Sequence, residues 1–112
     1  MNAEDKVERI LRGVLQEAGR DYVGLWHIAM IVRRELGLTQ SDEVRIEVLL
    51  IVRGLLERGL CPGDLLQSGF HFWRQKDADA VQARISREWE PGKGDPSLEK
   101  PICWFAPYSD RG

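Results

Sequence analysis

The fold is decided by residues 41–73, SDEVRIEVLLIVRGLLERGLCPGDLLQSGFHFW, where a helical pattern gives way to a strand pattern. In the first half, apolar residues recur every three or four positions and form one helix face: Val44, Val48, Ile51 and Leu55. Ser41 and the two acids after it suit the first turn of a helix, where a cap and negative charge are favoured. Gly59 followed by Leu60 is typical of a helix end. Within this helix, Gly54 indicates either close helix packing or a tolerated surface glycine.

The second half of this stretch predicts two short strands. Residues 61–63, Cys-Pro-Gly, are typical of a turn because proline and glycine interrupt regular structure. Residues 65–66 and 70–73 then flank a second turn signal, Gln-Ser-Gly. Because side chains alternate along a strand, we expect the two phenylalanines of residues 70–73 on one face, and His71 and Trp73 on the other.

Two amphipathic helices are expected before this stretch. Residues 4–17 carry one apolar stripe with charged residues between its members, and Gly19 can end the helix. Residues 22–36 form the second, with Asp21 as its cap and Gly37 as its end. This second helix is apolar nearly all round along most of its length, so we expect it in the middle of the fold.

A fourth helix and a last strand are expected after residue 73. Asp77 begins the helix and Pro91 closes it. Its buried face would be formed by Val81, Ile85 and Trp89. Residues 91–101 hold three prolines and two glycines and are expected to form a loop. Residues 102–105 predict a short final strand, and we expect residues 106–112 to fray.

The order of these elements, three helices followed by a strand pair, is that of a winged helix-turn-helix domain. The expected fold class is therefore mainly α with a small antiparallel β element: three N-terminal helices, a β-hairpin, a fourth helix and a short final strand. The 112 residues are 43% apolar, enough for one modest core, and they show no repeat or domain boundary. We expect a single domain over residues 1–112.

Spaced glycine and aromatic residues carry a more particular resemblance. The pattern comprises Gly59-Leu60-x-x-Gly63-Asp64-Leu65, Gly69-Phe70-x-x-Trp73, Ile85-x-x-Glu88-Trp89 and Trp104-Phe105. Over residues 55–105 it resembles a group of small, uncharacterised bacterial proteins. The resemblance implies a winged-helix-like fold and very little about function, because glycines and aromatic residues at such spacings are markers of a fold.

Composition and the N-terminal sequence bear on partners and compartment. Lys and Arg number 16 against 18 Asp and Glu, which argues against a strongly basic nucleic-acid coat. The N-terminus, MNAEDKVERI, carries acids where a secretory signal carries basic residues, and no apolar run approaches the roughly 20 residues needed to cross a bilayer. We therefore expect a cytoplasmic protein in which Cys61 and Cys103 are free thiols.

The residues that could carry chemistry do not form a known site. The candidate metal ligands are His27, His71, Cys61 and Cys103, and no two have a spacing that pre-positions ligands. Cys61 has no basic activator beside it in the sequence, and Cys103 lies in an apolar strand. Acids two residues apart, such as Asp77 and Asp79, cannot face one substrate together. The sequence therefore predicts no metal, no cofactor and no enzymatic activity.

DNA binding is the alternative hypothesis, because the expected fold invites it. In a helix-turn-helix, the first turns of the third helix enter the major groove. Here those turns carry Asp42, Glu43 and Glu47 beside a single Arg45, and the expected wing at residues 67–69 has no Lys or Arg. Acids at these places would repel phosphates, whose neutralisation supplies much of the affinity for DNA.

The preferred hypothesis is a non-catalytic protein-binding module. Trp73, opposite the two phenylalanines of its strand, is a candidate partner-binding residue if it is partly exposed, because exposed aromatic residues anchor interfaces. The alternative is that Trp73 packs under the fourth helix. Acidic side chains that could meet a basic partner are Asp42, Glu43, Glu47, Asp77, Asp79, Glu88 and Glu90.

A small, acidic, motif-poor protein of this kind is similar in character to immunity proteins, such as those of contact-dependent growth-inhibition systems. Nuclease toxins carry basic clefts for phosphate, and an acidic surface can fill such a cleft and exclude the substrate. We therefore expect the partner to be a basic toxin domain. The sequence leaves the oligomeric state open.

Overall fold

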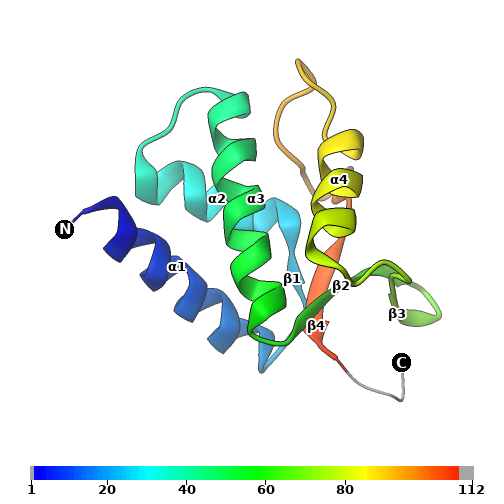
Figure 1. Ribbon diagram of the computed structural model, residues 1–112. Helices are drawn as coiled ribbons and strands as arrows, with labels where there is room; N and C mark the ends of the chain where they lie inside the picture. The colour runs from blue at the N-terminus through cyan, green and yellow to red at the C-terminus, as the bar shows by residue number, and fades with distance from the viewer. Residues whose placement is uncertain (1, 109–112) are drawn as a thin grey trace.

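The computed structural model describes residues 2–108 and shows four helices packed on one small sheet (Figure 1). In chain order the elements are α1 (Ala3–Ala18), β1 (Val23–Gly24), α2 (Leu25–Leu36), α3 (Ser41–Glu57), β2 (Leu60–Leu66), β3 (Gly69–Phe72), α4 (Ala78–Glu88) and β4 (Trp104–Pro107). The expected fold class, mainly α with a small antiparallel β element, is confirmed.

The sheet has four antiparallel strands in the order β1-β4-β2-β3. The last strand of the chain therefore lies between the first two. Phe105 of β4 pairs with Val23 of β1 on one side and with Pro62 of β2 on the other. The three helices and the β2–β3 hairpin follow the expected order, and β1 and β4 extend the hairpin into a wider sheet.

The expected start of the second helix at residue 22 is wrong. Val23 and Gly24 pair with β4 instead, so α2 begins at Leu25 with Gly24 at its N-cap position. Asp21 does not cap α2; its carboxylate accepts a hydrogen bond from the backbone N–H of Tyr22 at 2.7 Å. Pairing with a strand more than 80 positions away overrides the local helical pattern.

The expected turn at residues 61–63 is also wrong, because these residues form the first half of β2. The carbonyl of Pro62 accepts a hydrogen bond from the N–H of Trp73 at 3.0 Å. In a strand, the N–H and C=O of one residue point to the same side. A backbone N–H at position 62 would therefore point toward Trp73, which lies beyond the end of β3, and its absence in proline costs no bond between the two strands. The sheet thus accommodates proline without losing a bond inside the β2–β3 ladder.

The final strand lies two residues later than expected. Ile102 has a positive φ of 66°, and the N–H of Cys103 bonds to the carbonyl of Pro101 at 2.7 Å, which makes a γ-turn. This turn delays β4 to Trp104–Pro107. Ala106, expected to fray, is 6% exposed within the sheet. Residues 109–112 of the expected frayed tail lie outside the described residues.

The two faces of the sheet have different surroundings. Its inner face meets the helices, and Figure 1 shows α3 and α4 lying in front of it. The inner-face residues include Val23, Leu60, Trp73, Cys103 and Phe105, all 3% exposed or less. The alternate residues of the same strands form the outer face, which includes the side chains of Tyr22, Phe70, Phe72 and Tyr108.

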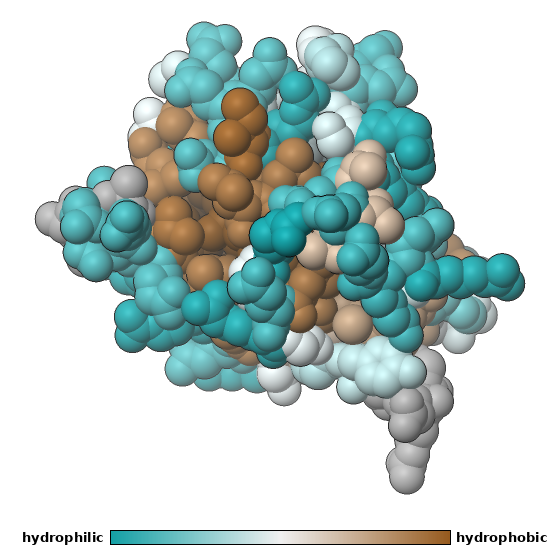
Figure 2. Space-filling model, in the orientation of Figure 1, coloured by the Kyte–Doolittle hydropathy of each residue, from teal (hydrophilic) through white to brown (hydrophobic). Residues whose placement is uncertain are grey.

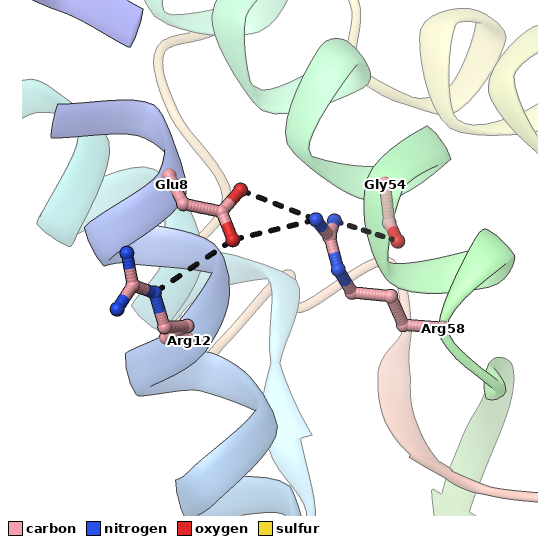
Figure 3. A network of polar contacts seen from close by, with 4 residues as sticks. All are labelled: Glu8, Arg12, Gly54 and Arg58. Atoms are coloured by element: carbon pink, nitrogen blue, oxygen red, sulfur yellow. Dashed lines mark hydrogen bonds and ion pairs between the residues drawn. The ribbon is translucent and has the colours of Figure 1, made fainter. Parts of the chain in front are cut away.

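Gly54 marks a close approach of α1 to α3. A Cβ atom at this position would lie 2.9 Å from Cδ2 of Leu11 on α1. Beside it, Nη2 of Arg58 lies 3.1 Å from a carboxylate oxygen of Glu8, and Nε of Arg12 lies 3.7 Å from the other oxygen (Figure 3). Of the two interpretations of Gly54, close helix packing is therefore the one that the structure supports.

Alanine substitutions at Gly13 and Gly54 distinguish the effect of helix propensity on stability from the effect of packing between helices. Gly13 on α1 has nothing within 4 Å of its Cβ position, so Gly13→Ala should raise the free energy of unfolding by about 0.5–1 kcal/mol. At Gly54 the same gain is offset by the contact with Leu11, so Gly54→Ala should leave stability unchanged or lower it by about 1 kcal/mol. Urea unfolding of both variants measures the difference; an equal gain at the two sites would show that α1 and α3 are not packed closely there.

Candidate protein-binding surface on helix α3

Helix α3 exposes two large apolar side chains to solvent. Ile46 is 58% exposed and Leu50 is 56% exposed, one turn further along the helix. The buried ridge of the same helix, Val44, Val48, Ile51, Val52 and Leu55, lies on its opposite side. Figure 2 shows hydrophobic side chains gathered over α3 and toward α1, with hydrophilic residues around them. Exposed apolar groups that cluster in this way are typical of a binding surface.

Acidic side chains border this apolar pair. Glu43 and Glu47 lie one turn before Ile46 and Leu50 on the same helix. Within residues 2–108, neither of these two carboxylates takes part in an ion pair or a hydrogen bond. Glu43, Ile46, Glu47 and Leu50 together are called the α3 surface below. Asp42 lies beside it but is engaged, since its Oδ1 atom is 3.6 Å from Nη2 of Arg45.

The acids of α4 are mostly engaged within the protein. Asp77 is the N-cap of α4 and accepts a hydrogen bond from the N–H of Ala80. Asp79 pairs with Arg53 of α3. Glu88 lies 2.8 Å from Nε of Arg84.

Glu90 follows α4 and is exposed. Because α3 and α4 run in opposite directions, the first turn of α3 lies next to the end of α4, where the Arg45 guanidinium donates to the carbonyl of Trp89. Glu90 therefore lies at the end of α4 that is next to the first turn of α3, whereas Asp77 and Asp79 lie toward the other end of α3.

Contacts from three other elements hold α3 in place. Gln82 of α4 donates to the carbonyl of Leu49 at 2.8 Å. Asp95, in the loop before β4, accepts from the Ser41 hydroxyl at 2.7 Å and from Nε of Arg33 on α2 at 2.9 Å. The hydrogen bond and the charge of Asp95 raise the pKa of Arg33. The beginning of α3 is thus tied to α2 and to the loop, so the α3 surface is presented on a rigid element.

Trp73 is not exposed, so of its two interpretations partial exposure is wrong and packing under the fourth helix is confirmed. It is 3% exposed on the inner face of the sheet. Its indole N–H donates to Asp64 at 3.2 Å, and the guanidinium of Arg84 on α4 stacks over the ring at 3.6 Å from the centroid. Helix α4 therefore covers Trp73, which acts in packing.

The residues that carried the family resemblance contact one another. Gly63 leaves room for the neighbouring Phe70 ring, whose Cζ atom would lie 2.6 Å from a Cβ at position 63. Gly63 also pairs with Trp104 across the sheet. Arg84, which pairs with Glu88, lies over Trp73. These contacts explain the pattern as a set of packing requirements.

The structure places one cysteine at a partly buried position and the other in the core. Cys61 and Cys103 are free, and burial raises the pKa of both thiols, most strongly at Cys103. Lys76 lies close enough to Cys61 to oppose this rise, although no basic residue is adjacent in sequence. Between residues 2 and 108, no group of three His, Cys, Asp or Glu could hold a metal ion.

The helices of residues 2–108 include none with the length and apolar character needed to cross a membrane.

Ile46 and Leu50 were missed because they lie outside the buried ridge of their helix. The same sequence contains the signal for them: two large aliphatic residues four positions apart on a face that also carries Asp42, Glu43 and Arg53. A helix whose polar face is interrupted by such a pair has a second apolar surface.

Comparison with family models, curated proteins and solved structures finds no match to this chain.

The thiol environments predict different reactivities. At pH 8, iodoacetamide should label Cys61 more slowly than a free cysteine, because a raised pKa lowers the thiolate fraction. Cys103, 1% exposed, should stay unlabelled until the protein unfolds. Mass spectrometry of time points with and without denaturant measures both rates. Labelling of native Cys103 as fast as Cys61 would contradict the burial of Cys103.

Proposed function

We propose that this chain is a non-catalytic protein-binding module that recognises its partner through the α3 surface. The observation that supports the proposal is the pair Ile46 and Leu50, each more than half exposed on a helix fixed at its first turn by Asp95. An exposed apolar pair lowers the solubility of a protein unless another protein covers it. A helix face that is already held in place also loses little conformational entropy when it binds.

The partner that this surface fits is a protein with basic groups around an apolar site. Glu43 and Glu47 are available for charge pairing at the border of the apolar pair. Opposite charges steer encounter and raise the association rate, and the apolar pair supplies the buried contact. The more specific proposal is an immunity protein that occludes a basic nuclease toxin in the cytoplasm.

Sequence-specific DNA binding is the other candidate, and the order of the three helices and the hairpin favours it. The charges of α3 oppose it. Arg45 already donates to the carbonyl of Trp89, and Arg53 already pairs with Asp79, so both arginines of that helix are engaged. The helix face that would meet the major groove carries two aliphatic residues and two unpaired carboxylates.

Aspartate at Ile46 or Leu50 should remove binding without unfolding the protein. The partner to test is a basic toxin domain found in a neighbouring reading frame, with binding measured by calorimetry and protection by growth on co-expression. Ile46→Asp or Leu50→Asp should weaken binding by about 30-fold or more, the loss typical of a central contact. Met30→Asp on α2, at a position 49% exposed, is the matched control and should bind like the wild type. Wild-type affinity for both α3 variants, or protection without a complex, would overturn the proposal.

Charge reversal tests steering separately. Glu43→Lys with Glu47→Lys should slow association at low salt and leave dissociation nearly unchanged, because exposed charges act mainly on encounter. Stopped-flow mixing at two ionic strengths measures both rates. A gel-shift titration of the wild type and of the same variant against the chain's own promoter region should show no sequence-dependent complex. Sequence-dependent binding by the wild type would instead favour the DNA-binding alternative.

A further inference from the structure

The outer face of the sheet carries a row of four aromatic rings that the core does not use. Tyr22 stacks on Phe70 with ring centroids 4.7 Å apart and planes 5° apart. Phe70 meets Phe72 edge to face at 4.9 Å, and Phe72 meets Tyr108 at 5.5 Å. The two tyrosines at the ends of the row are 42% and 52% exposed. Phe70 is only 8% exposed beneath this packing, so the rings hold one another in place and the two tyrosines carry most of the exposed surface of the row.

These rings line a groove of about 500 Å³. Its walls come from the end of α1, from the segment before β1, and from β3 and β4. At the rim, Arg20 and Asp21 are adjacent and of opposite charge. The groove is thus mainly apolar, with four aromatic residues in its lining, and the two charges give it no strong preference for an anion.

The ring of Tyr108, which lines the groove, already has a cation over one of its faces. The ammonium nitrogen of Lys76 lies 3.9 Å from the centroid of Tyr108 and 5.8 Å from that of Phe72. Aromatic faces are negative because of the ring quadrupole, so they attract an ammonium group at such distances. Lys76 lies just before the N-cap residue of α4, and its side chain is exposed. It can therefore leave the rings without disturbing the core.

We propose that this aromatic groove is a second binding site, which takes a lysine side chain from an extended peptide segment of a partner protein, and that Lys76 occupies the position until it is displaced. The charge complementarity seen between Lys76 and the ring faces identifies the occupant as an ammonium group. The peptide backbone on either side of the lysine would lie along the groove, between Tyr22 and Tyr108.

This site is separate from the α3 surface. Helix α3 packs against the inner face of the sheet, whereas the four rings lie on the outer face. The proposal therefore goes beyond the proposed function, and either one can fail without the other.

Tetramethylammonium and tert-butanol are matched probes, since they have similar shape and differ in charge. Lys76→Met removes the internal ammonium and keeps an unbranched apolar side chain. In this variant, tetramethylammonium should shift the ring proton resonances of Tyr108 and Phe72 with a millimolar dissociation constant. Binding to the wild type should be about two- to fivefold weaker, because Lys76 competes for the ring faces. Tert-butanol should produce shifts at least fivefold smaller.

A second variant and a peptide pair complete the test. Tyr108→Leu in the Lys76→Met background should remove the binding, while circular dichroism checks that the variant is folded. A five-residue peptide, Gly-Pro-Lys-Pro-Gly, should bind Lys76→Met more tightly than the same peptide with norleucine in place of lysine. Equal shifts with the charged and neutral probes would show an apolar groove without selectivity for a cation. That result, shifts confined to other residues, or equal affinity for both peptides would overturn the proposal.

Discussion

The insertion of β4 between β1 and β2 is the constraint on which the rest of the structure depends. The strand pairs on both sides, so Phe105 reaches the centre of the core with no exposed surface. The insertion fixes where α2 begins, because β1 takes two residues from the expected helix. It also requires the loop before β4 to run past the beginning of α3, where Asp95 ties Ser41 to Arg33. One long-range pairing thus sets both the core and the position of α3.

Two surfaces with different chemistry result from this arrangement. On the helical side, α3 presents an aliphatic pair bordered by carboxylates. On the other side, the four rings of the sheet pack on one another, and the ammonium group of Lys76 lies over the ring of Tyr108. A partner with basic and apolar groups suits the first surface, and a lysine-bearing extended peptide suits the second.

The local elements could be predicted from the sequence, and the long-range ones could not. Helices α1, α3 and α4 begin and end close to the expected residues because their caps and apolar spacing are encoded within each segment. The pairing of Val23 with Phe105 depends on residues 82 positions apart, for which a single sequence holds no signal. For the same reason residues 61–63 were interpreted as a turn, although the carbonyl of Pro62 completes a bond to Trp73.

The acidic residues of the α3 surface could be predicted from the sequence, and its apolar pair, Ile46 and Leu50, could not. Glu43 is exposed and Glu47 is half-exposed on α3. Trp73 lies under α4, where its indole N–H donates to Asp64 and the guanidinium of Arg84 stacks over its ring. The most direct test of the α3 surface is methyl cross-saturation in a complex with the partner. Saturation of the partner's protons should attenuate the methyl signals of Ile46 and Leu50 most strongly and leave Met30 unaffected. Attenuation that spares Ile46 and Leu50 and falls on other methyl groups would contradict recognition through α3.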